Sequence, residues 1–315
     1  MGRKLTLPTL VGIALLVGLS VTAPWLKFVF TIALAKGLAV LGILLLLRAG
    51  PVSFGHALYV AVGAYTVAFA RPSIGEALIL LPMAVMAATT VGVLVGLFVT
   101  RYRDIFFGML NLAFSMVFYS LLEKLYAYTK GTDGIRVERP TIAGVMLERV
   151  PYEWTMLCVV IALAVGLGVL AKIFLTSPLG QALPAIKARE TRLEFAGVSA
   201  KGVLLVSYVA SAALAGLGGG IISITTLHVT PLLAFWTHSG ELVFIAILGG
   251  GGAVLGPFLG AVVFELVRVY AAAAFPDAWQ MILGAVLLGI ILFAARGLWG
   301  IYEDVTARMG MGARR

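Results

Sequence analysis

The sequence predicts an all-α protein, a polytopic bundle of transmembrane helices that forms a single domain over residues 1–315. The composition is the first observation: 61% of the residues are hydrophobic, 12% are charged and the mean hydropathy is +1.07. Soluble domains are about 45–50% apolar and about 25% charged. The second observation is that the apolar residues gather in runs of about 20, the length with which a helix crosses a bilayer. A soluble globule could not bury this much apolar surface.

This composition excludes a soluble enzyme, a disordered chain and a disulfide scaffold. The single cysteine, Cys158, cannot form an internal disulfide, and we expect a small buried side chain. The net charge of +9 would indicate nucleic-acid binding in a soluble protein. Here the basic residues are scattered between apolar runs, which is typical of cytoplasmic loops, so we expect no nucleic-acid partner.

Seven apolar runs are continuous and predict one membrane span each. The first follows Arg3 and Lys4, and we expect it to be an uncleaved helix. In chain order the runs are Leu5–Pro24, Phe28–Leu47, Ala77–Thr100, Ile105–Leu125, Trp154–Leu175, Val203–Thr226 and Trp279–Ala295.

Two further apolar regions, Pro51–Ala70 and Glu241–Phe275, are interrupted by glycine, and the second is long enough for two helices. We therefore expect about 10 spans, within a range of 8–11. Non-helical backbone at membrane depth needs shielding by protein or a cavity. The breaks are thus where a substrate pathway is expected, and the candidates are Ser53, Gly55, His56, Gly249, Gly250, Gly251 and Gly252.

Half-helix N-termini at such breaks present free N–H groups that favour a carboxylate. The alternative is that the glycines only allow close helix packing. His56 has the same two interpretations, a pathway residue or a side chain that bonds a neighbouring carbonyl.

The distribution of Lys and Arg gives the orientation. With the N-terminus inside and ten crossings, 14 of the 23 basic residues fall in inner loops and 7 in outer loops. Both termini are therefore expected in the cytoplasm. Lys36 and Arg268 fall within spans. We expect Arg268 to pair with Glu265, Lys36 to snorkel or to meet a partner permease, and Glu241 to be a helix-start charge.

Two polar segments separate the spans, an outer loop over 124–153 and an inner, basic loop over 176–201. In the inner loop Ser177 suits a helix N-cap and Pro178 a first helical position. The spacing of Leu179, Leu183 and Ile186 places them on one helix face. Pro184 predicts a break between two short helices, the second ending at Gly197.

Five elements of the chain, in order and over nearly its whole length, resemble the permease family of branched-chain amino acid ABC importers (LivM type). AGPVSFGHA at Ala49–Ala57 resembles the family's GxxSxGHA, and KGTDGI at Lys130–Ile135 resembles TGGxDG. SAALAGLGG at Ser211–Gly219 resembles SAxxAGLAG, and LGGGGAVLGPFLG at Leu248–Gly260 resembles LGGxGTxxGPxxGA. The inner loop resembles the "EAA" coupling loop, although Ala188 and Arg189 depart from its usual AIRENE.

The resemblance implies a membrane permease that translocates branched-chain amino acids by alternating access. The implied partners are two ATPase subunits, which bind the ATP, a second homologous permease, an extracytoplasmic substrate-binding protein and membrane lipid. The chain itself has no GxxxxGK[ST] phosphate loop, so we expect no ATP hydrolysis by it, no cofactor and no metal. The implied location is the plasma membrane of a prokaryote, the inner membrane if it is Gram-negative.

The resemblance also assigns residues to the contacts with these partners. Contact with the binding protein is expected in the outer loop at Gly131, Asp133 and Gly134, where Asp133-Gly134 favours a turn. Coupling to the ATPases is expected at Ser177, Pro178, Gly180, Leu183, Ala185, Ile186, Arg189, Glu190 and Gly197.

Three alternatives stay open from the sequence. A secondary transporter driven by an ion gradient would need acidic residues along its pathway, and the spans contain few. A membrane scaffold or enzyme subunit would need no amphipathic inner loop. The same ABC type also includes importers of urea, short amides and other amino acids.

Overall fold

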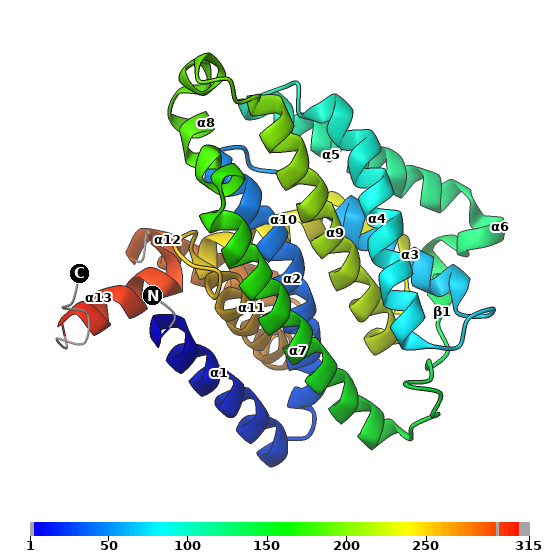
Figure 1. The fold of residues 1–315 in the computed structure, drawn as a ribbon. Coiled ribbons are helices and arrows are strands. Elements are labelled where there is room, and N and C mark those ends of the chain that lie inside the picture. Colours follow the sequence, from blue (N-terminus) through cyan, green and yellow to red (C-terminus); the bar gives the residue numbers. More distant parts are fainter. Residues whose placement is uncertain (1–2, 294–295, 309–315) are drawn as a thin grey trace.

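Helices make up most of this computed structural model, which describes residues 3–293 and 296–308 (Figure 1). The helices of its first half are α1 (Arg3–Thr22), α2 (Leu26–Ala49), α3 (His56–Ala70), α4 (Ala77–Val99), α5 (Asp104–Lys124) and the short α6 (Tyr126–Thr129). Those of its second half are α7 (Arg149–Thr176), α8 (Pro178–Phe195), α9 (Ala200–Thr226), α10 (Trp236–Gly249), α11 (Gly256–Ala274), α12 (Trp279–Phe293) and α13 (Gly297–Arg308).

Six of these helices are long and apolar enough to cross a membrane, namely α2, α4, α5, α7, α9 and α11. Shorter apolar helices occupy Pro8–Thr22, His56–Ala70 and Trp279–Ile290. The all-helical class of the protein is thereby confirmed, while the number of crossings stays a prediction.

Every predicted span coincides with a helix to within a few residues, apart from the start of α7, which begins at Arg149 rather than Trp154. Both glycine-interrupted regions are interrupted in the structure: residues 50–55 separate α2 from α3, and residues 250–255 separate α10 from α11. Some predictions fall outside the described residues. These are the cytoplasmic placement of Gly2, Arg314 and Arg315 at the two termini, and the end of the last span at Ala295.

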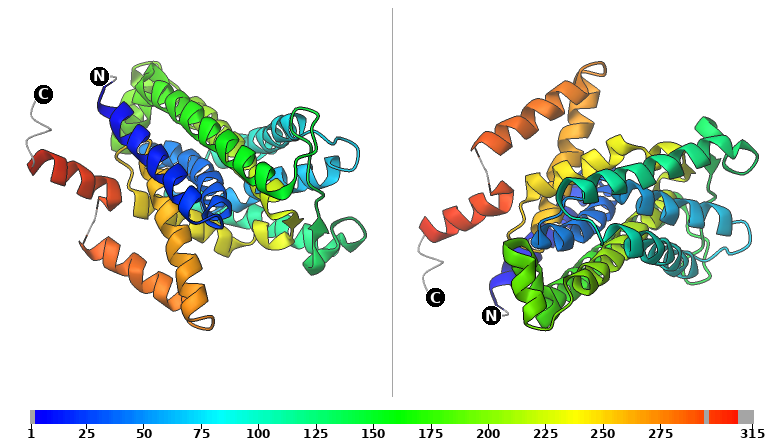
Figure 2. Two further views of the ribbon diagram at one scale, coloured as in Figure 1. Left: turned by 90° about the horizontal axis from the view of Figure 1, so that it is seen from below. Right: turned by 90° about the horizontal axis from the view of Figure 1, so that it is seen from above.

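The centre of the bundle is α2, whose membrane-length segment is buried throughout. Helices α9, α11, α7 and α10 pack around it. The close approach of α9 depends on small residues, because a Cβ on Gly218 would meet the backbone of Ala35 in α2. Helices α12 and α13 lie to one side of this core (Figure 2).

The polar segments gather at two opposite ends of the bundle (Figure 1). At one end lie α8, the α4–α5 link and both glycine breaks. At the other end the loop between α5 and α7 forms a short strand, β1 (Ile135–Arg136), that pairs antiparallel with β2 (His228–Val229). A short 3-10 helix, Pro231–Ala234, leads from β2 into α10.

Two local predictions were wrong. Cys158 is exposed on the outer surface of α7 rather than buried. Helix α8 continues through Pro184, and its backbone leaves the helical region only at Arg189 (φ −162°, ψ 100°). Pro184 lies on the exposed side of α8, while Leu183 and Ile186 hold the opposite side against the bundle.

Candidate functional site

The inner loop helix α8 is fixed to the bundle by an apolar face. Ser177 caps the helix, because its Oγ accepts a hydrogen bond from the Gly180 N–H at 3.3 Å, and Pro178 follows at the first helical position. Leu183 is fully buried and, with Ala182 and Ile186, packs against Ala49, Ala200, Val203 and Leu204. These residues therefore hold α8 in place. Leu179, predicted on the same face, is instead exposed.

The bend at Arg189 is explained by Glu190. Its carboxylate accepts two hydrogen bonds from Arg103 in the α4–α5 link, from Nη2 at 2.6 Å and from Nε at 2.8 Å. These hydrogen bonds are the largest cause of the lowered pKa of Glu190; burial opposes the shift, and the positive charge of Arg103 adds to it. To reach Arg103 the chain must turn out of the helix one residue earlier, so a long-range pair decides where α8 bends.

The remaining coupling candidates on α8 differ in their exposure to solvent. Pro178 and Arg189 are exposed, Ala185 is half-buried, and Gly180 is buried against the end of α7. Gly197 has a φ of +82° and closes α8 with a hydrogen bond from Val198 N–H to Leu193 O at 3.2 Å, as in a Schellman motif.

Phe195 is a feature that the sequence analysis missed. Its side chain is 93% exposed at the tip of α8, next to the turn at Gly197. A large aromatic side chain in this position is unusual unless a partner covers it. The signal in the sequence is an aromatic residue two positions before a helix-ending glycine in an otherwise polar loop.

The first glycine break leads into a closed, polar interior. Ser53 and His56 are fully buried, and His56 Nε2 lies 3.2 Å from Ser211 Oγ in α9. The first turn of α3 is also satisfied within the protein, because Ser239 Oγ accepts the Ala57 N–H at 3.0 Å. In this conformation the start of α3 is capped by a side chain of α10 and is not open to a ligand.

A chain of hydroxyl and amide groups continues from this point. Tyr59 OH donates to Tyr208 OH at 2.7 Å, and Tyr208 OH donates to Asn111 Oδ1. Gly55 lies so close to the backbone of Asn111 that a Cβ there would overlap the Asn111 carbonyl. Close packing therefore accounts for Gly55, and its place in a pathway stays a prediction.

The second break lies beside the first. Arg48, at the end of α2, donates from Nη2 to the Gly252 carbonyl at 3.1 Å. Gly249 packs against the backbone of Gly256, and Gly250 has a φ of +85°. Gly251 and Gly252 are exposed at this end of the bundle. Arg48 thus links the two breaks, although they are about two hundred positions apart in sequence. The candidates of the first break lie against other helices, Gly55 against Asn111 in α5 and His56 against Ser211 in α9.

An ion cluster in the middle of the bundle was predicted only in part. The Glu265–Arg268 pair is confirmed at 2.9 Å. Lys36, which was expected to snorkel or to meet a partner, is 4% exposed and lies 2.6 Å from Glu265 Oε1 and 3.0 Å from Glu241 Oε2. Glu241, expected to be a helix-start charge, is thus an ion-pair partner. The cluster joins α2, α10 and α11 with two positive and two negative charges.

The outer-loop candidates lie next to the strand pair. Gly131 and Gly134 have φ angles of +51° and +71°. A Cβ on Gly134 would lie 2.8 Å from Thr230 Cγ2, so the turn at this position requires glycine. The exposed Asp133 accepts a hydrogen bond from Tyr126 OH at 3.1 Å. The loop is also held at its far side, where Glu76 Oε1 accepts the Ala143 N–H at 2.7 Å.

Comparisons with known proteins show what the chain is similar to. Residues 25–291 match the family described as "Branched-chain amino acid transport system / permease component". The chain is 25% identical over 272 residues to the high-affinity branched-chain amino acid transport system permease protein LivM of Escherichia coli K12. It is 26% identical over 271 residues to the protein of the same name in Salmonella typhimurium LT2. No solved structure matches the chain significantly.

Each match covers 79% of this chain and 64% of the relative. The chain therefore spans less than two thirds of the length of the curated relatives it matches.

Proposed function

The chain belongs to the family of permease components of branched-chain amino acid transport systems, and from this premise we propose that it is a membrane subunit of an ATP-binding-cassette importer. It carries branched-chain amino acids inward by alternating access. The observation that carries the proposal is the family match over residues 25–291, which includes both glycine breaks and the α8 loop.

The proposed topology has ten crossings, made by α1 to α5, α7 and α9 to α12. Both termini and α8 then lie in the cytoplasm, and the β1–β2 end faces outward. The basic residues support this orientation, since Arg48, Arg103 and Lys187 all lie at the α8 end of the bundle. The membrane is the plasma membrane of a prokaryote, the inner membrane if the organism is Gram-negative.

Two separate ATPase subunits supply the energy, and one of them docks on the solvent side of α8. The two faces of this helix support the proposal. Leu183 and Ile186 pack the helix against the bundle, while Arg189 and Phe195 are exposed to solvent. Because Glu190 pairs with Arg103 in the α4–α5 link, a displacement of α8 is transmitted to α4 and α5.

On the opposite face an extracytoplasmic binding protein delivers the substrate near Gly131, Asp133 and Gly134. A second, homologous permease completes the pathway. The present conformation is closed around Ser53 and His56, so transport requires α3 and α10 to separate where Ala57 now bonds Ser239. Glu241 and Glu265 are paired with Lys36 and Arg268, two acids with two bases, which favours a structural role over one in ion coupling.

The ATPase contact is tested by affinity purification of the tagged chain from membranes of its own host. We expect ATPase subunits to co-purify, and Arg189→Glu or Phe195→Ser to reduce their recovery by about tenfold, since a few exposed residues dominate such contacts. Arg136→Glu, the same charge change at the opposite end, is the matched control and should leave recovery unchanged. Absence of any ATPase, or equal recovery with all variants, would contradict the proposal.

A further inference from the structure

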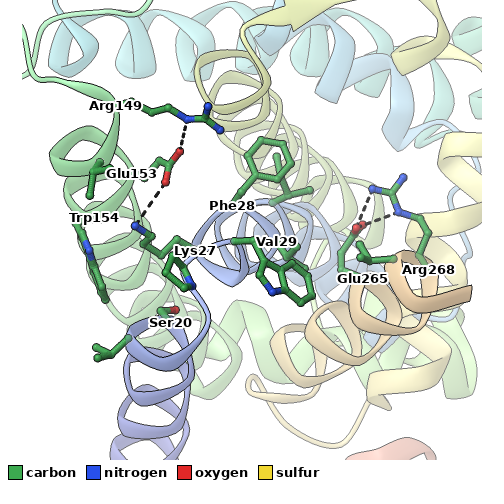
Figure 3. A pocket seen from close by; sticks show the side chains of 15 residues that line it. Ser20, Lys27, Phe28, Val29, Arg149, Glu153, Trp154, Glu265 and Arg268 are labelled. Atoms are coloured by element: carbon green, nitrogen blue, oxygen red, sulfur yellow. Dashed lines mark hydrogen bonds and ion pairs between the residues drawn. The ribbon is translucent and has the colours of Figure 1, made fainter. Parts of the chain in front are cut away.

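A cavity of about 910 Å³ opens at the end of the bundle where α1 gives way to α2. Figure 3 shows Lys27, Glu153 and Arg149 on one wall and Glu265 with Arg268 on the opposite wall. The walls come from α2 and α7 on one side and from α11 on the other. None of the functional contacts described above uses this cavity.

The charges on the first wall are unbalanced. Lys27 Nζ lies 3.5 Å from Glu153 Oε2, and Arg149 Nε lies 3.0 Å from Glu153 Oε1, so two cations share one carboxylate. The Lys27 side chain is only 3% exposed. On the second wall Glu265 already pairs with Arg268 and with Lys36. The cavity therefore has a surplus of positive charge that one phosphodiester anion would neutralise.

A second cavity, apolar and about 570 Å³ in volume, is lined by residues of α1 and α11 among other helices. Successive residues of these two helices line the two cavities: Leu19 and Leu266 line the apolar one, and Ser20 and Glu265 line the charged one. Helix α1 lies at the edge of the bundle (Figures 1 and 2), and its residues line this groove. Between Pro8 and Leu19 the groove follows α1 for about 16 Å. One leaflet of a bilayer has a hydrocarbon depth of about 15 Å.

We propose that these two cavities hold one phospholipid molecule. Its phosphate binds beside Arg149 and Lys27, and an acyl chain fills the groove between α1 and α11. Trp25 and Trp154 line the charged cavity at the level where aromatic side chains meet lipid headgroups. The lipid joins α1 to the rest of the bundle by filling space in which the groove walls otherwise lack van der Waals partners.

The apolar half of the site is tested by a pair of substitutions on one helix. Gly12 lines the groove and Gly18 lines neither cavity, and both positions have open space around a new Cβ. We expect native mass spectrometry of the full complex in mild detergent to show about one phospholipid per chain in the wild type and in Gly18→Phe. Gly12→Phe should lose about tenfold or more of it, equivalent to about 1.4 kcal/mol of binding free energy. Equal retention in the two variants, or no retained lipid in the wild type, would overturn the proposal.

The headgroup half is tested by Arg149→Gln, with Arg136→Gln as a control cation outside both cavities. Delipidated complex is offered phosphatidylglycerol or diacylglycerol in detergent micelles. We expect the wild type and Arg136→Gln to bind the phospholipid in preference to diacylglycerol, and Arg149→Gln to lose this preference. Equal binding of the two lipids by the wild type would overturn the phosphate assignment. Loss of a partner polypeptide from Gly12→Phe with lipid retained would show that the groove is a protein contact instead.

Discussion

The buried charges of this protein are arranged so that each has a partner in the described part of the chain. Lys36 contacts both Glu241 and Glu265, and Glu265 also contacts Arg268. Removing Lys36 would leave Glu265 with Arg268 and Glu241 with His238 as their ion-pair partners among the described residues, in a region of low polarity. A buried charge without its partner is strongly destabilising, whereas removal of both charges often costs little.

This arrangement predicts that Lys36→Met destabilises the protein by about 3–5 kcal/mol. The double variant Lys36→Met, Glu241→Gln should recover most of that loss, because Glu265 keeps Arg268. The midpoint of thermal unfolding in detergent measures both. A double variant no more stable than Lys36→Met would show that the acids do not depend on the lysine.

The Arg103–Glu190 pair gives a pH dependence with a definite sign. Hydrogen bonds from Arg103 keep the folded-state pKa of Glu190 below its unfolded value of about 4.3. The pair therefore stabilises the fold at any pH above that value and stops doing so as the pH falls through the lower, folded pKa.

We expect Glu190→Gln to lower stability at pH 7 by about 1 kcal/mol or less, because the pair is partly exposed. The difference from wild type should disappear in acid, which unfolding midpoints between neutral and acid pH would show. Glu194→Gln, a change of an exposed acid on the same helix, serves as the control. A difference between Glu190→Gln and wild type that persists in acid would rule out the ion pair as its source.

At the scale of elements, α8 has one side for the bundle and one for solvent. Leu183→Ala removes a fully buried side chain from a small cluster, and we expect a cost of about 2–5 kcal/mol. Leu179→Ala changes an exposed leucine four residues earlier and should cost about 0.5 kcal/mol or less. Hydrogen exchange over α8 reports this directly: faster exchange in Leu183→Ala and unchanged exchange in Leu179→Ala. The reverse order would mean that α8 packs by its other face.

The sequence was sufficient for the helices because a membrane span needs a long apolar run, and glycine marked both places where such runs are interrupted. It failed where distant residues decide the outcome. Pro184 was expected to bend α8, but the bend lies at Arg189, directly before Glu190, whose carboxylate pairs with Arg103. Lys36 was expected to snorkel or to meet a partner permease, because Glu241 and Glu265, with which it pairs, are about two hundred positions away in sequence. Helix α13 was not predicted, since it is short and only partly apolar.

For the site, the sequence identified the two glycine breaks and α8 but not how they meet. Their contact depends on Arg48, which spans from the end of α2 to Gly252. The sequence also offered two explanations for the start of α3, a carboxylate site or close packing. In the structure Ser239 accepts the Ala57 N–H, a backbone group that a carboxylate could otherwise bind. Gly55, directly before α3, lies against the backbone of Asn111 in α5, as close packing requires.

At the scale of the whole molecule, the polar segments lie at the two ends (Figure 1), and the interior around Ser53 and His56 is closed in this conformation. His56, Tyr59, Tyr208 and Asn111 form a buried polar path between α3, α5 and α9, flanked by apolar helices. A permease that alternates its access must open such an interior from one end at a time. The proposed ATPase contact on α8 and the proposed binding-protein contact near Asp133 lie at opposite ends of the bundle, where the two openings of an alternating-access cycle would occur.

The central claim is tested most directly by uptake of labelled leucine in cells with and without this chain, with unlabelled isoleucine and valine as competitors. ATP depletion and treatment with an ionophore are run side by side. We predict that uptake requires the chain and ATP, survives collapse of the ion gradient and is reduced by both competitors. Uptake that stops when the gradient collapses while ATP is maintained would contradict the account.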